Sequence, residues 1–112
     1  MIKAVFEYGK NGEVTSFTVE GHGGIGLKGR KATKGNDILC AGVSTLVQGV
    51  IVGLKYVTNA NPNIETKESG LLDCKIGSPE NKETKALLNT LIISLKNLEE
   101  QFPENLKIEI LR

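Results

Sequence analysis

The stretch that decides the fold lies near the middle of the chain, where residues 38–54 read ILCAGVSTLVQGVIVGL. Its many Val and Ile residues would suit a buried helix or a pair of strands. Its length, the preceding Asp37 and the absence of an internal turn favour a helix. Apolar residues occupy most of its circumference, which is typical of a helix covered on two sides. Glycines at 42, 49 and 53 would permit another backbone to approach, and a second copy of the chain is one candidate.

Runs that predict β-strands stand on both sides of this helix. Residues 2–8 and 14–20 are separated by Gly9-Lys10-Asn11-Gly12, and an Asn-Gly pair between two such runs predicts an antiparallel hairpin. After the helix, residues 64–67 and 71–76 flank a Glu-Ser-Gly turn and predict a second hairpin. The sequence therefore predicts two strands before the helix and two after it.

A second helix is predicted to follow the second hairpin. Ser78 as N-cap, Pro79 at the first helical position and Glu80 in the first turn would open it. Its apolar face consists of leucines spaced three or four residues apart, namely Leu87, Leu88, Leu91, Leu95 and Leu98. Pro103 ends the helix, and alternation over residues 106–111 predicts a closing strand. The order β-β-α-β-β-α-β predicts an α+β fold, with a mostly antiparallel sheet and two helices.

The composition sets limits on the class of protein. We expect residues 1–112 to form one domain, because the length and the 39% hydrophobic content are ordinary for a single globular core. A net charge of +1 gives no global field that would attract nucleic acid. Two cysteines and a start without a signal-peptide pattern favour a reducing cytoplasm. The apolar run at 38–54 is interrupted and shorter than a membrane span, so no transmembrane segment is expected.

Two side chains are candidates for chemistry. With Asp37 as N-cap, Cys40 would fall in the first helical turn, where unpaired N–H groups and the helix dipole lower a thiol pKa and could hold an oxyanion. The single histidine, His22, would lower that pKa further as an imidazolium and supply a proton, an arrangement that suits acyl transfer. The alternatives are that Cys40 is only a small buried residue and that His22 is solvated surface. Spacing alone does not bring the two side chains together.

A family resemblance bears on this choice. Gly21-His22, a glycine-rich stretch and then GNDILCAGVS at 35–44 resemble the G-H…G-x-D-I-x-C-A-x-V-S signature of the bacterial ribosomal-processing cysteine proteases. The resemblance implies a dimeric α+β protein in which His22 and Cys40 form a catalytic pair. It also implies that the substrate is the N-terminal extension of large-subunit ribosomal protein L27. The stretch between His22 and Cys40 is longer than the family pattern, with the extra residues around 28–34.

The segment from Gly21 to Asn36 is predicted to be a mobile surface loop. Its glycines would form a substrate loop that closes over a peptide, namely Gly23, Gly24, Gly26, Gly29 and Gly35. The alternative function is a non-catalytic ribosome-associated binding module, whose RNA contacts would come from the loop's basic residues Lys28, Arg30, Lys31 and Lys34. The loop has no aromatic residue for base stacking, so binding of nucleic acid is disfavoured.

The remaining motifs give weaker predictions. Asp37 could orient His22 instead of capping the helix. No metal is expected, because His22, Cys40 and Cys74 lack the paired spacing of zinc ligands. The G-x-G-x-x-G match at 24–29 lacks the strand-to-helix context of a nucleotide site, so no cofactor is expected. Cys74, between Leu72 and Ile76 in a predicted strand, is interpreted as a core residue or as a spectator without a role in the chemistry.

Overall fold

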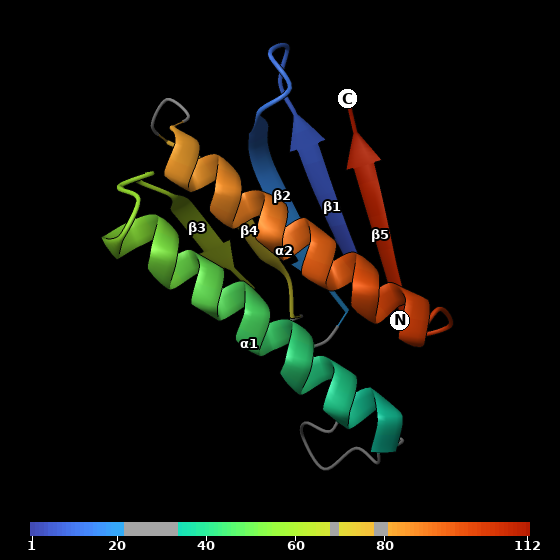
Figure 1. Ribbon diagram of the computed structural model, residues 1–112. Helices are drawn as coiled ribbons and strands as arrows, with labels where there is room; N and C mark the ends of the chain where they lie inside the picture. The colour runs from blue at the N-terminus through green and yellow to red at the C-terminus, as the bar shows by residue number, and fades with distance from the viewer. Residues whose placement is uncertain (22–33, 68–69, 78–80) are drawn as a thin grey trace.

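The computed structural model of the protein describes residues 1–21, 34–67, 70–77 and 81–112, with the backbone alone for 34–38 (Figure 1). In these residues, five strands form one sheet in the order β3-β4-β2-β1-β5 and two helices pack on it. Their bounds are β1 (Ile2–Tyr8), β2 (Val14–Glu20), α1 (Lys34–Tyr56), β3 (Asn63–Thr66), β4 (Leu72–Lys75), α2 (Lys82–Gln101) and β5 (Leu106–Leu111). The α+β prediction and the order of the elements are confirmed.

The first hairpin forms as the Asn-Gly pattern predicts. β1 and β2 pair antiparallel, and Phe6 lies opposite Phe17 with ring centroids 5.5 Å apart. In the turn, Gly9 N–H donates to the Glu13 carbonyl at 2.7 Å, and Gly12 has a positive φ of 79° that favours glycine. The stacked rings join the two strands on the face that the helices cover.

The sheet is mixed. β1–β2, β2–β4 and β3–β4 are antiparallel, whereas β5 pairs parallel with β1 from Ile2↔Leu106 to Glu7↔Leu111. The parallel pair requires a long crossover, since a parallel neighbour cannot be reached by a tight turn. The predominance of antiparallel pairing is as predicted.

Both helices cover the same face of the sheet (Figure 1). In β1 and β4, buried residues that face the helices alternate with more exposed residues that face away. The core between the layers contains fully buried side chains from every layer, including Phe6, Phe17, Leu39, Leu54, Leu91, Leu95 and Leu106. The opposite face of the sheet carries no helix among the described residues, so its side chains are open to solvent.

The start of α1 corrects three predictions. The helix begins at Lys34, so Asp37 lies within it and is not its N-cap. Gly35 belongs to the helix and not to a loop, and Cys40 falls in the second turn and not the first. The apolar pattern marks only the packed part of a helix, whereas an established helix extends over polar residues at little cost per residue.

The predicted cap of α2 is also wrong. Asn81 is the N-cap, and its Oδ1 accepts a hydrogen bond from Thr84 N–H at 2.8 Å. Its Nδ2 donates to the Thr58 carbonyl at 3.2 Å, so the cap also ties α2 to the segment that follows α1. Asn and Ser are equally good N-cap residues. The hydrogen bond to Thr58 could not be predicted from neighbouring residues, because Thr58 is distant in the sequence. Residues 78–80, where the cap was expected, lie outside the described residues.

The stretch Leu39–Tyr56 of α1 meets the length and composition of a membrane span. In this fold its buried side chains, among them Leu39, Val43 and Leu54, pack against the sheet and α2. A core helix meets the same criterion, and α1 acts as one here.

Candidate active site

α1 holds Cys40 near one end of the sheet. One small pocket between the helix and the sheet is lined by Val19 of β2, Leu72 of β4 and by Val43, Ser44, Val47 and Gln48 of α1. Val19 is close to the end of β2, and Cys40 precedes Ser44 by about one helical turn. The N-terminal part of α1 continues in that direction (Figure 1). Cys40 therefore lies toward the end of the sheet where β2 stops.

The Cys40 side chain is half-buried and packs against the core cluster. The unpaired N–H groups of a helix are those of its first four residues, here 34–37, and the field of a helix dipole falls off within the first turn. In the second turn, Cys40 receives less help from α1 than a first-turn residue would. Activation of its thiol then depends more on a neighbouring base.

β2 ends at Glu20, and Gly21 is the last described residue before His22. His22 itself and the predicted loop glycines Gly23, Gly24, Gly26 and Gly29 lie outside the described residues. The structure thus places the attachment point of His22 and the helical turn of Cys40 at the same end of the sheet. Contact between the two side chains stays a prediction.

A pocket of about 410 Å³ opens beside Gly21, and Met1, Lys3, Glu20 and Leu71 line the rest of it. Lys3 and Glu20 lie opposite each other in the β1–β2 ladder, each next to a buried residue of its strand. They therefore project from the face of the sheet that the helices leave open. The segment carrying His22 leaves β2 at the border of this pocket.

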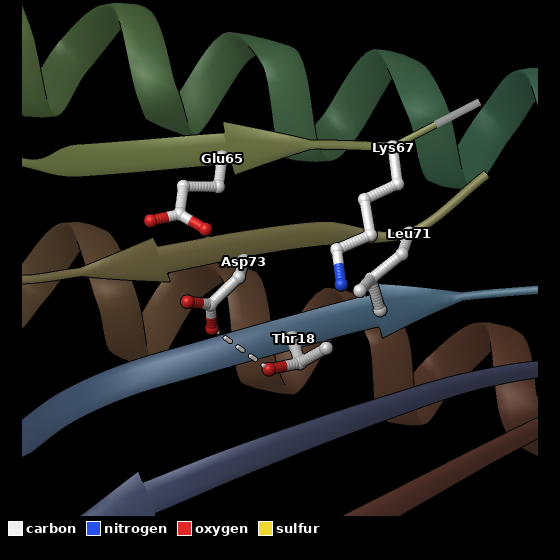
Figure 2. Close-up of a pocket in the computed structure, with 5 residues that line it drawn as sticks. All are labelled: Thr18, Glu65, Lys67, Leu71 and Asp73. Atoms are coloured by element: carbon white, nitrogen blue, oxygen red, sulfur yellow. Dashed lines mark hydrogen bonds between the residues drawn. The ribbon is translucent and has the colours of Figure 1, made fainter. Parts of the chain in front are cut away.

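A second pocket of about 270 Å³ continues the first across the open face, and the two share Leu71. Figure 2 shows Thr18, Glu65, Lys67 and Asp73 around it, on the side of the strands away from the helices. Thr18 Oγ1 donates to Asp73 Oδ1 at 3.0 Å, which fixes that carboxylate. Together the two pockets present three carboxylates and two lysines on the open face of the sheet.

These pocket residues were not predicted as functional from the sequence. Thr18 and Asp73 are partners in the β2–β4 ladder, and Glu65 and Asp73 are partners in the β3–β4 ladder. The alternation of polar and apolar residues within each strand could have assigned their common face. Which strands are neighbours could not be read from that alternation.

Cys74 is the second thiol, and it has no access to these pockets. It is 0% exposed, in β4, on the face toward the helices. The pKa of the Cys74 thiol is raised to about 12, mainly by burial and in addition by the Asp73 carboxylate, whereas Lys55 acts in the opposite direction. The interpretation of Cys74 as a core residue is confirmed.

Known proteins with similar sequences identify the family of this chain. A family model described as cysteine protease Prp matches residues 1–107. The ribosomal processing cysteine protease Prp of Staphylococcus aureus is 28% identical over 109 residues, covering 96% of this chain and 97% of that protein.

Two crystal structures of the essential ribosomal processing protease Prp from S. aureus share the fold. One contains a covalently linked product peptide and matches with a TM-score of 0.83 at 27% identity, covering 98% of this chain and 99% of that one. The other contains a substrate peptide and matches with a TM-score of 0.85 at 25% identity, with the same coverage. The chain described here belongs to the Prp family of cysteine proteases.

Proposed function

We propose that this chain removes the N-terminal extension of ribosomal protein L27, with Cys40 as the nucleophile and His22 as the general acid and base. The observation that carries the proposal is the position of Cys40. α1 holds it half-buried toward the end of the sheet where β2 delivers the chain to His22. The S. aureus relatives bound to a substrate peptide and to a covalently linked product peptide support a peptide substrate and a covalent intermediate.

The proposed reaction has two halves. The Cys40 thiolate attacks the carbonyl carbon of the scissile peptide bond, and the bond to nitrogen breaks as His22 gives its proton to the departing amine. This leaves a thioester between Cys40 Sγ and the N-terminal fragment. His22, now neutral, accepts a proton from water, whose oxygen attacks the thioester carbonyl. The fragment leaves as a carboxylic acid and Cys40 is regenerated.

Because a reducing compartment keeps free thiols from forming disulfides, the proposal includes action in the cytoplasm, with residues 1–112 working as one protease domain. The experiment that tests the function uses a peptide copying the N-terminus of L27 across its extension. Wild type should cleave it and Cys40→Ala should not. Equal turnover by the two proteins, or none by either, would favour the binding module over the protease.

The proposal includes a homodimer formed through α1. Only 39% of the apolar stretch Leu39–Tyr56 is buried within one copy of the chain. The exposed side of the helix carries Val52 and Tyr56, which are 52% and 76% exposed, and Gly49 between turns. An apolar exposed helix face is typical of a contact surface, and a second copy would cover it symmetrically.

Light scattering at micromolar concentration should give the mass of a dimer, and Val52→Glu should weaken association by on the order of 100-fold, because it buries an unpaired charge. Leu111→Glu is the matched control. Leu111 is also exposed, at 46%, but it lies on β5 at the far edge of the sheet. A monomeric wild type, or equal effects of the two variants, would contradict an interface on α1.

A further inference from the structure

Gly21 occupies a position in which the backbone geometry and the packing both require glycine. Its φ is +95°, in the region that other L-residues rarely adopt. The β1–β2 register pairs Lys3 with Glu20, so Gly21 lies opposite Ile2. A methyl group on Gly21 would overlap the Met1 carbonyl oxygen and would lie 3.4 Å from the Ile2 Cα. The obstacle is backbone, which cannot turn aside as a flexible side chain does.

This geometry lies at a functional position. The chain leaves the β2 ladder at Gly21 with a positive φ, and the Met1 carbonyl occupies the space that a side chain there would need. The next residue is His22, so the direction in which Gly21 leaves the sheet sets where the histidine begins. Because Cys40 receives less help from the start of α1 than a first-turn residue would, its activation depends more on how well that histidine is placed.

We infer that Gly21 is a positioning residue for the His22–Cys40 pair, acting through its positive φ and its close contact with Met1. This inference rests on the proposed function. By positioning His22, Gly21 would help to set the protonation state of the Cys40 thiol, in addition to any effect on the stability of the hairpin.

Other glycines supply matched controls. Gly12 has a positive φ of 79°, but a methyl group there meets nothing within 4 Å. Gly77 lacks the positive φ, but a methyl group there would overlap the Asn61 carbonyl oxygen. Gly12→Ala therefore tests backbone strain alone, and Gly77→Ala tests a backbone overlap beside the start of β2, at the end of the strand away from Gly21. Each should alter stability without altering the chemistry of Cys40.

The experiment measures the rate of Cys40 alkylation by iodoacetamide against pH, at a temperature where each protein is folded. His22→Ala defines the profile of the thiol without its partner. Gly21→Ala should move the profile of wild type toward that of His22→Ala and lower kcat for peptide cleavage by on the order of 100-fold with little change in KM. Gly12→Ala and Gly77→Ala should keep the wild-type profile.

A second variant serves if Gly21→Ala does not fold. Inserting one glycine between Gly21 and His22 leaves Gly21 beside Met1 and moves His22 one residue further along the chain, and it should give the same shifted profile. Wild-type profiles in both the Gly21→Ala and insertion variants, with His22→Ala still shifted, would overturn the inference and leave the proposed function standing. Identical profiles for wild type and His22→Ala would overturn the His22–Cys40 pair itself, and with it both proposals.

Discussion

Cys40 and Cys74 are the same side chain in two different environments. Cys74 lies in β4, 0% exposed, with the sheet on either side and the helices over it. Cys40 lies in α1, half-buried, toward the end of the sheet where β2 stops and the path to His22 begins. Burial between layers removes water from a thiolate, whereas a position at the end of the sheet leaves room for a substrate and a base.

The charges around the two thiols sharpen this difference. Asp73 precedes Cys74 and its carboxylate opposes ionisation of the Cys74 thiol. The proposed partner of Cys40 is an imidazolium, which favours the thiolate. The nucleophile of a cysteine protease must be accessible to a substrate and a base. The end of the sheet gives that access, and the packed core does not. The comparison between the two thiols makes four predictions, of which the first concerns activity.

Removing either member of the proposed pair should abolish processing. Cys40→Ser and His22→Ala should each lower kcat/KM for the L27 peptide by on the order of 1,000-fold or more, because the nucleophile or its proton partner is lost. Stability should change little, since Cys40 is only half-buried. Peptide cleavage followed by mass spectrometry, with thermal unfolding as the check on folding, measures both. Retained cleavage in Cys40→Ser at unchanged stability would exclude Cys40 as nucleophile.

The two thiols should differ in reactivity by on the order of 100-fold or more. In native protein at pH 7.5, iodoacetamide should modify Cys40 and leave Cys74 unmodified, because the raised pKa and the burial of Cys74 both oppose reaction. After unfolding in urea, both should react. Peptide mapping of the alkylated protein identifies each site. Comparable native rates at the two cysteines would show that the core around Cys74 opens readily.

Stability should show the reverse order. Cys74→Ser places a hydroxyl in the core and should lower the free energy of unfolding by about 1–3 kcal/mol, while cleavage by the folded protein stays within about threefold of wild type. Cys40→Ser should cost less, because its site is half-buried. Urea unfolding of the two variants gives the comparison. A larger loss at Cys40 than at Cys74 would contradict the burial difference described here.

The parts of the fold that depend on neighbouring residues could be predicted from the sequence. The strand runs 2–8, 14–20 and 106–111 were predicted at the bounds the structure shows, because alternation and a tight turn leave little choice of period or register. The parallel pairing of β5 with β1 depends on how α2 crosses the sheet. The Asn81 cap depends on Thr58, which comes from another part of the chain. Both are tertiary effects that no local window contains.

The candidate site divides in the same way. Cys40 was predicted as a candidate nucleophile from its neighbours in the sequence, and the structure places it toward the end of the sheet. The prediction that it lies in the first turn of α1 was wrong, because polar residues extend the helix back to Lys34. The pockets around Leu71 were missed because they join residues of β1, β2, β3 and β4 that only the strand order brings together. The pairing of His22 with Cys40 stays a prediction.

The smallest expected effect is a pH dependence of stability that belongs to Cys74 alone. Its pKa is raised from 9.0 to about 12 in the folded protein, so between these values the folded state keeps a proton that the unfolded state has lost. Stability rises with pH only where the unfolded state binds more protons, and here it binds fewer. The stabilisation is therefore complete below about pH 9 and is lost as the pH rises through the folded value of about 12.

The measurement must separate Cys74 from the other ionisable groups of the chain. Cys74→Val removes the titrating group and keeps a small apolar side chain suited to a strand. The free energy of unfolding in urea should fall more steeply for wild type than for Cys74→Val above pH 9, by at most about 1.4 kcal/mol per pH unit, and the two slopes should agree below pH 8. Parallel slopes up to pH 11 would mean that Cys74 ionises in the native protein, and the core would then be as accessible as the site of Cys40.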